Sequence, residues 1–138
     1  MRALIALGAV LVFCPAAWAE GKCDAGKPDI FTFVKWKVTA PANGRVEINM
    51  TFHNNLDQTL SQASFGGPIF DASGKQVQHI SIEVQEDVAA KADHTETYVL
   101  ADDHPDAFVA KVKDATPVLC AYTVIEKGTR KRTDYLSQ

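Results

Sequence analysis

Histidine is the residue type in this chain with the clearest capacity for metal chemistry, because imidazole nitrogen binds zinc and copper. The chain contains His53, His79, His94 and His104. No two of them have a tight ligand spacing such as H-x-H or H-x-x-x-H. Met50 alternates with apolar residues, which argues against a methionine-rich copper site. We therefore predict no cofactor. A metal site in which histidines and acidic loop residues converge from distant strands stays open as an alternative.

The densest polar group in the sequence consists of Asp102, Asp103, His104 and Asp106. Carboxylates at alternating positions of a loop can ligate calcium. The EF-hand pattern is absent, because no glycine stands at its sixth position and no glutamate at its twelfth. We interpret this group as a solvated loop tip.

Residues suited to catalysis form no recognisable set. The sequence contains no G-x-S-x-G motif and no glycine-rich phosphate loop. We therefore predict no catalytic residues and expect a protein that binds rather than catalyses. A small secreted hydrolase is the alternative, since a triad assembled from distant residues leaves no local motif.

Four basic residues lie close together near the C-terminus: Lys127, Arg130, Lys131 and Arg132. Such residues often protect a sheet edge, because lysine deters the addition of a further strand. The functional alternative is a contact for an anionic surface, either lipid headgroups or an acidic partner. The formal net charge of the whole chain is −3, whereas nucleic-acid binding requires a basic face. Nucleic acid is thus excluded as a partner.

Residues 1–19 are typical of a secretory signal peptide. Arg2 provides a positive start, and residues 3–13 form an apolar run too short to span a membrane. Ala17-Trp18-Ala19 is a small-x-small cleavage site. A lipoprotein box ending at Cys14 is the alternative, although the bulky Phe13 stands where a small residue is needed.

Cleavage after Ala19 leaves 119 of the 138 residues, which is the length of one domain. We therefore predict a single β-sandwich domain over residues 20–138, located in the periplasm or outside the cell. No second long apolar segment follows, so we do not expect an integral membrane protein. The expected partner is a protein or another component of the cell envelope.

Two cysteines remain after cleavage, Cys23 and Cys120. Two cysteines in an exported chain most simply pair with each other. The bridge would close a loop of almost the whole domain, which the chain-entropy model values at about 4 to 5 kcal/mol. A redox or catalytic thiol is the alternative, but the sequence lacks C-x-x-C.

The mature chain reads as short strands separated by turn signals. Asn43-Gly44 predicts a hairpin between the first two strands, and Pro68 suggests a bulge or an edge position for the third. Trp36 is placed with Val34 and Val38 on the buried face of the first strand, between two sheets. The predicted strands are 31–38, 46–53, 62–70, 77–84, 95–100, 107–113, 118–126 and 129–136.

Seven or eight short strands with frequent turns are typical of an all-β sandwich. Cys120, Tyr122 and Val124 are expected on one face of their strand by alternation. The polar run that follows Phe52 is interpreted as the corner where a strand ends, because asparagine and aspartate bond nearby backbone groups. Leu56 and Leu60 would fill that corner from inside.

The segment 46–77 resembles the FxLYD-type family of bacterial Ig-like domains. Ile69-Phe70-Asp71 and Gly74-Lys75 match the family's "LYD…GK" pattern, and Asn54-Asn55 match its asparagine corner. Gly67 and Asn49 depart from it, since the family has a phenylalanine and a glycine there. The resemblance implies an Ig-like sandwich on an exported bacterial protein that acts as an interaction module, with no catalytic residues to carry over.

Overall fold

The computed structural model describes residues 29–135. The predicted signal peptide, the cleavage site, Cys14 and Cys23 lie outside these described residues. Eight strands and one helix follow one another along the chain. They are β1 (Phe31–Thr39), β2 (Arg45–Asn54), β3 (Leu60–Phe70), β4 (Gln76–Val84), β5 (Asp93–Ala101), α1 (Pro105–Val112), β6 (Thr116–Pro117), β7 (Cys120–Glu126) and β8 (Arg132–Asp134).

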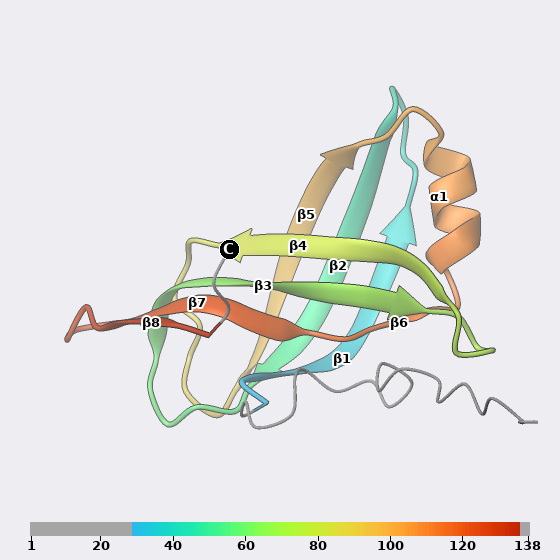
Figure 1. Cartoon of the computed structure of the whole chain (residues 1–138). Helices are drawn as coiled ribbons and strands as arrows, with labels where there is room; N and C mark the ends of the chain where they lie inside the picture. Colours follow the sequence, from blue (N-terminus) through green and yellow to red (C-terminus); the bar gives the residue numbers. More distant parts are fainter. Residues whose placement is uncertain (1–28, 136–138) are drawn as a thin grey trace, which may run out of the picture.

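The strands form two antiparallel sheets, which confirms the predicted all-β sandwich. One sheet has the order β1-β2-β5, and the other has the order β4-β3-β7-β8 with β6 paired to β3. If the long strands and β8 are lettered A, B, C, C′, E, F and G in chain order, the sheets read A-B-E and C′-C-F-G. The strand order, though not the crossing of the two sheets, matches that of Ig-like sandwiches. Figure 1 shows the strands of one sheet running across those of the other.

The core lies between the sheets, and β2 contributes to it through an alternating row of apolar residues. Val46, Ile48, Met50 and Phe52 are at most 1% exposed, and they face the second sheet. Phe52 packs 4.7 Å from Phe65 of β3, measured between ring centroids. Phe31 lies 5.3 Å from Phe52, edge to face. Aromatic pairs of this geometry add stability beyond the area that they bury.

A bulge in β1 corrects the predicted face of that strand. The register with β2 shifts between Phe33 and Lys35, which leaves Val34 45% exposed. Phe33 and Trp36 then share the inward side, and their rings meet edge to face at 5.8 Å. Trp36 is half-buried against the core, because β1 is an edge strand. Strict alternation wrongly placed Val34 inside, since it cannot anticipate one extra residue in a strand.

The strand that contains Pro68 is central, which corrects the suggestion of an edge position. β3 pairs with β4 on one side and with β6 and β7 on the other. Val118 donates its backbone N–H to the Pro68 carbonyl oxygen at 2.9 Å. The missing N–H of Pro68 therefore does not prevent the strand from being flanked on both sides. The predicted irregularity is present nearby as shifts of register along β3.

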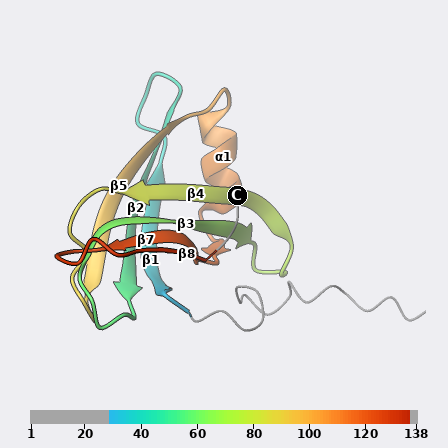
Figure 2. The ribbon, with the colours of Figure 1, turned by 60° about the vertical axis from the view of Figure 1, so that its left-hand side comes forward.

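Residues 107–113 were predicted as a strand, and this prediction is wrong. Residues 107–112 belong to α1 and Lys113 is its C-cap; the helix has Pro105 in its first turn, Asp106 also near its start and Lys111 in its last turn. Proline and an acid suit the start of a helix, and a base suits its end. Phe108 and Val112, four residues apart, form the buried side. The helix connects the two sheets and contacts β1, β2 and β4 (Figure 2).

The predicted face of β7 also needs correction. Its register with β3 shifts between the pairs Ser64–Thr123 and Phe65–Ala121, so that Ala121 and Val124 are both buried. Cys120 and Tyr122 are only half-buried and do not share the core with Val124. Partial burial raises the pKa of the Tyr122 phenol. Among the described residues, no helix has the length and apolar character needed to cross a membrane.

Candidate functional site

The polar run after Phe52 is a structural corner, as the sequence predicted. Asn54 is completely buried, and its carboxamide donates to the carbonyl oxygens of Gln58 and Ala89, each at 3.1 Å. The same side chain accepts the backbone N–H of Leu56 at 3.0 Å. The Asn54 carboxamide therefore joins the β2–β3 loop to the β4–β5 loop. Its bonding groups are engaged within the fold and are not presented to a ligand.

The segment that resembles the "LYD…GK" pattern is a tight turn held by one carboxylate. Asp71 Oδ1 accepts hydrogen bonds from the backbone N–H of Ser73 at 2.9 Å and of Lys75 at 3.0 Å. The Ser73 hydroxyl donates to the same oxygen at 2.6 Å. These bonds, led by that of the Ser73 side chain, lower the pKa of Asp71. The motif residues therefore shape the β3–β4 turn.

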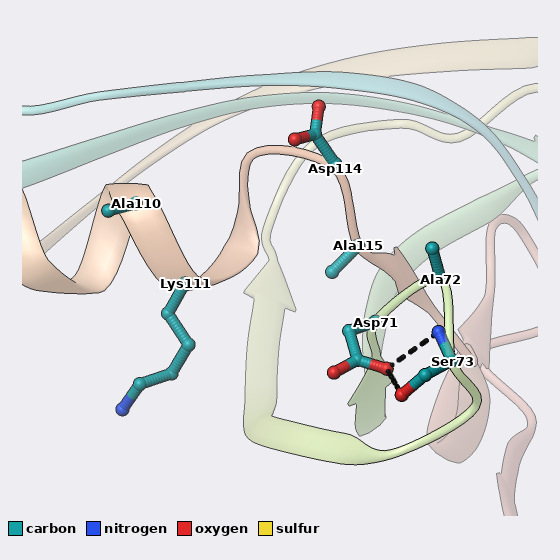
Figure 3. Close-up of a pocket in the computed structure, with 7 residues that line it drawn as sticks. All are labelled: Asp71, Ala72, Ser73, Ala110, Lys111, Asp114 and Ala115. Carbon is teal, nitrogen blue, oxygen red and sulfur yellow. Dashed lines mark hydrogen bonds between the residues drawn. The ribbon is translucent and has the colours of Figure 1, made fainter.

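A cavity of about 380 Å³ lies between this turn and the end of α1 (Figure 3). Asp71 and Ser73 line it from the turn, and Lys111 and Asp114 line it from the helix side. The Asp71 carboxylate points back to Ser73, whereas the Lys111 amine and the Asp114 carboxylate point away from each other. The charged groups do not converge on one point, so the cavity has no evident chemistry.

Three of the four histidines take part in no grouping of metal donors among residues 29–135. His53 lies on the outer side of β2, where its Nδ1 is 2.8 Å from Asp93 Oδ1 of β5. His79 is exposed on β4. His104 occupies the residue position before α1 without a capping side-chain hydrogen bond, and its backbone N–H donates to Asp102 Oδ1 at 2.7 Å. The group Asp102 to Asp106 thus forms the turn into the helix.

His94 is the exception, because it meets two glutamates from the same side of the sandwich. Alternation in β5 places His94 and Glu96 on its inward face, opposite Phe52 and Met50 of β2. His94 Nε2 lies 3.2 Å from Glu96 Oε2, and the two side chains are 14% and 24% exposed. Glu86 reaches them from the β4–β5 loop, and one ligand atom from each residue lies within 4.8 Å of the others.

The loop that carries Glu86 is held in place by the two residues that follow it. Val88 and Leu60 exchange two backbone hydrogen bonds, each 2.9 Å long. Asp87 forms an ion pair with Lys127 of the β7–β8 hairpin. The sequence offered one signal for this cluster, the H-x-E spacing of His94 and Glu96 on a strand. It offered none for Glu86, whose approach depends on the loop.

The four basic residues near the C-terminus lie on the β7–β8 hairpin, but they are not equivalent. Lys127 pairs with Asp87, and the Nε of Arg132 donates to Asp134 Oδ1 at 2.9 Å. The Thr123 hydroxyl, followed by Arg132, lowers the pKa of the Asp134 carboxyl. Within residues 29–135, the exposed side chains of Arg130 and Lys131 have no hydrogen bond or ion pair.

Cys120 is half-buried at the start of β7, on the side where β3 presents Gly67. Its predicted partner Cys23 lies outside the described residues, so the bridge stays a prediction. In comparisons with known proteins, no family model, no curated protein and no solved structure matches the chain.

Proposed function

We propose that the mature chain is an exported interaction module that binds an acidic partner protein through the tip of the β7–β8 hairpin. The observation that supports this proposal is the pair of unpartnered cations, Arg130 and Lys131, at that tip. The flanking cations, Lys127 and Arg132, are already neutralised by carboxylates of this chain. In this proposal the module acts by binding and has no catalytic residues.

The hairpin is suited to present these two side chains. The backbone N–H of Arg130 donates to the Glu126 carbonyl oxygen at 3.1 Å, and the backbone N–H of Glu126 donates to the Lys131 carbonyl oxygen at 2.9 Å. The Thr129 hydroxyl bonds to Glu126 Oε2 at 2.8 Å. Figure 1 shows the tip projecting beyond the end of the sandwich. A partner would meet two positive groups on a turn of defined shape.

A protein partner fits two cations better than a lipid surface does. Each lysine or arginine near an anionic membrane contributes about 1 kcal/mol, so two of them give marginal attachment. Arginine can instead bind one carboxylate through two parallel hydrogen bonds, which adds both energy and geometric specificity.

The proposal also includes export, an Ig-like domain of the FxLYD type and the Cys23–Cys120 bridge. The Asp71 turn and the Asn54 corner lie where the resemblance places its motifs, which supports the family proposal. Intact-mass measurement of protein recovered from the envelope tests maturation and the bridge together. We expect an N-terminus at Glu20 and a mass increase of about two hydrogens on reduction. A lipid-modified Cys14 or two free thiols would contradict this part.

The binding proposal is tested by coupling with a carbodiimide, which joins lysine amines to carboxylates in contact with them. Purified mature protein is added to envelope extract, and the coupled products are mapped to individual lysines. We expect one product attached at Lys131. It should be much reduced in R130Q, which keeps the Lys131 amine, and unchanged in K35Q, a matched loss of one exposed charge on β1.

Two results would count against the acidic partner. Equal coupling at Lys131 in R130Q and in K35Q would show that the hairpin cations do not select the partner. Binding of the wild type to phosphatidylglycerol vesicles, lost in R130Q/K131Q, would assign the hairpin to a lipid surface instead.

A further inference from the structure

We propose that Glu86, His94 and Glu96 form a binding site for a divalent ion of the zinc class. The site lies at the edge of the sandwich, where β5 and the β4–β5 loop meet. It uses none of the hairpin cations, so it stands or falls independently of the proposed protein contact.

One pair of donor atoms already has the separation of zinc ligands, and the third donor lies close to them. Zinc binds histidine nitrogen and carboxylate oxygen at about 2.0 to 2.2 Å in a tetrahedron, so two of its ligand atoms lie about 3.3 Å apart. His94 Nε2 and Glu96 Oε2 are 3.2 Å apart. Their strand fixes this separation, because residues two apart share a face. Glu86 completes a three-ligand set with its ligand atom within 4.8 Å of the other two.

The charges at the cluster also favour a cation. Two carboxylates face one imidazole, and no lysine or arginine of the described residues forms an ion pair with Glu86 or Glu96. Lys127 forms its ion pair with Asp87, the residue next to Glu86, and not with Glu86 itself. His94 packs against Phe52 with 5.3 Å between ring centroids, and its side chain is only 14% exposed. Partial burial lowers the local dielectric constant, so the negative charges of the two glutamates repel each other more strongly than in water. A bound cation would offset this repulsion.

The mixed donor set selects the class of ion. Calcium and magnesium take oxygen ligands almost exclusively, and calcium needs six to eight of them. One imidazole with two carboxylates instead suits zinc, with water at the fourth position. The anchored loop supports the site, because Val88 and Leu60 hold the segment that carries Glu86 before any ion binds.

Zinc titration of the untagged mature protein, followed by calorimetry, tests the site. We expect one ion per chain and no comparable binding of calcium. E86Q should weaken zinc binding at least about tenfold, a loss known even for groups that only orient a ligand. E83Q is the matched control, because Glu83 is an exposed glutamate of neighbouring β4 that accepts hydrogen bonds from Gln62 and Gln85.

A second measurement separates metal binding from an ion pair that merely closes the sandwich edge. Zinc should shift the ring resonances of His94 in NMR spectra and leave those of exposed His79 unchanged. Zinc should also raise the melting temperature of E83Q and not that of E86Q. The proposal is overturned if the wild type binds no zinc, if E83Q weakens binding as much as E86Q, or if the His94 resonances do not respond.

Discussion

The carboxamide nitrogen of Asn54 donates a hydrogen bond to the carbonyl oxygen of Ala89, 35 residues further along the chain, at 3.1 Å. This bond links the end of β2 to the β4–β5 loop, one of the connections between the two sheets. The linked β4–β5 loop carries Glu86 towards His94. A side chain that ends a strand therefore also positions one member of the proposed zinc site.

We predict that Asn54→Ala lowers the free energy of unfolding by about 3 kcal/mol or more, because it leaves several buried backbone groups without partners. Asn54→Asp should be similarly harmful, since a carboxylate cannot donate to carbonyl oxygens. Asn49→Ala is the control, because the Asn49 bond to Thr97 is exposed. Urea unfolding measures all three variants. A loss below about 1 kcal/mol for Asn54→Ala would contradict the structural role.

Close packing of β3 against the edge strand β4 predicts that replacing Gly66 is costly. A Cβ atom on Gly66 would collide with the Ile80 backbone oxygen, whereas one on Gly74 would meet nothing within 4 Å. Gly74 has a φ of +81°, so its replacement costs only the roughly 1 to 2 kcal/mol of a left-handed residue. Gly66→Ala must shift backbone and should cost about 3 kcal/mol or more. Equal losses in thermal or urea unfolding would show that β3 and β4 can separate cheaply.

The sequence-based predictions were correct where a single local pattern determines the structure. Alternation located β2, and Asn43-Gly44 predicted a turn whose two residues do have positive φ, 59° and 66°. The predictions of the inward face of β1 and of an edge position for β3 were wrong. The first failed because of a one-residue bulge and the second because β3 is flanked on both sides, and both features depend on which strands pair. The segment Phe108 to Val112 fits both a strand and a helix face, and its burial at a four-residue spacing decided for the helix.

The candidate sites follow the same division. The basic residues could be identified from the sequence, but the pairing of Lys127 with Asp87 and of Arg132 with Asp134 could not. The first pair joins two loops that are distant in the sequence. His94 was one of four candidate histidines, and only the fold distinguishes it from His53 on the opposite side of the sheet. Glu86 contributes through a loop whose path is set by Asn54 and Val88, and no local pattern records that path.

Partial burial of Trp36 predicts an intermediate effect of its truncation. Trp36 packs on Phe33 at the edge strand and not in the centre of the core. Trp36→Ala should therefore cost about 2 kcal/mol, against about 3 to 5 kcal/mol for the fully buried Phe52→Ala. Trp36 is the only tryptophan besides Trp18 of the predicted signal peptide. In the native state, iodide should quench the Trp36 fluorescence partly. Fluorescence that iodide does not quench at all would place the ring in a closed core and contradict this placement.

The β3–β4 turn predicts how stability changes in acid. Hydrogen bonds from Ser73 and Lys75 lower the pKa of Asp71 from its usual value of 3.8 in the folded state. The stability that the ionised carboxylate contributes is therefore fully present above pH 3.8 and is lost as the pH falls through the lower folded pKa. Asp71→Ala should unfold more easily than the wild type at neutral pH, and this difference should shrink in acid.

Urea unfolding at neutral pH and at about pH 2.5 measures this difference, the lower value lying below the usual aspartate pKa. Asp114→Ala is the matched control, because Asp114 lines the same cavity and its only described ion pair is a 3.9 Å contact with neighbouring Lys113. The control should change little at either pH, since an exposed pair of that kind contributes little. If the Asp71→Ala deficit were the same at both pH values, the contribution of Asp71 would not depend on its ionised carboxylate, which would contradict the prediction. If Asp71→Ala caused no deficit at either pH, the bonds that Asp71 accepts would contribute nothing to the stability of the fold.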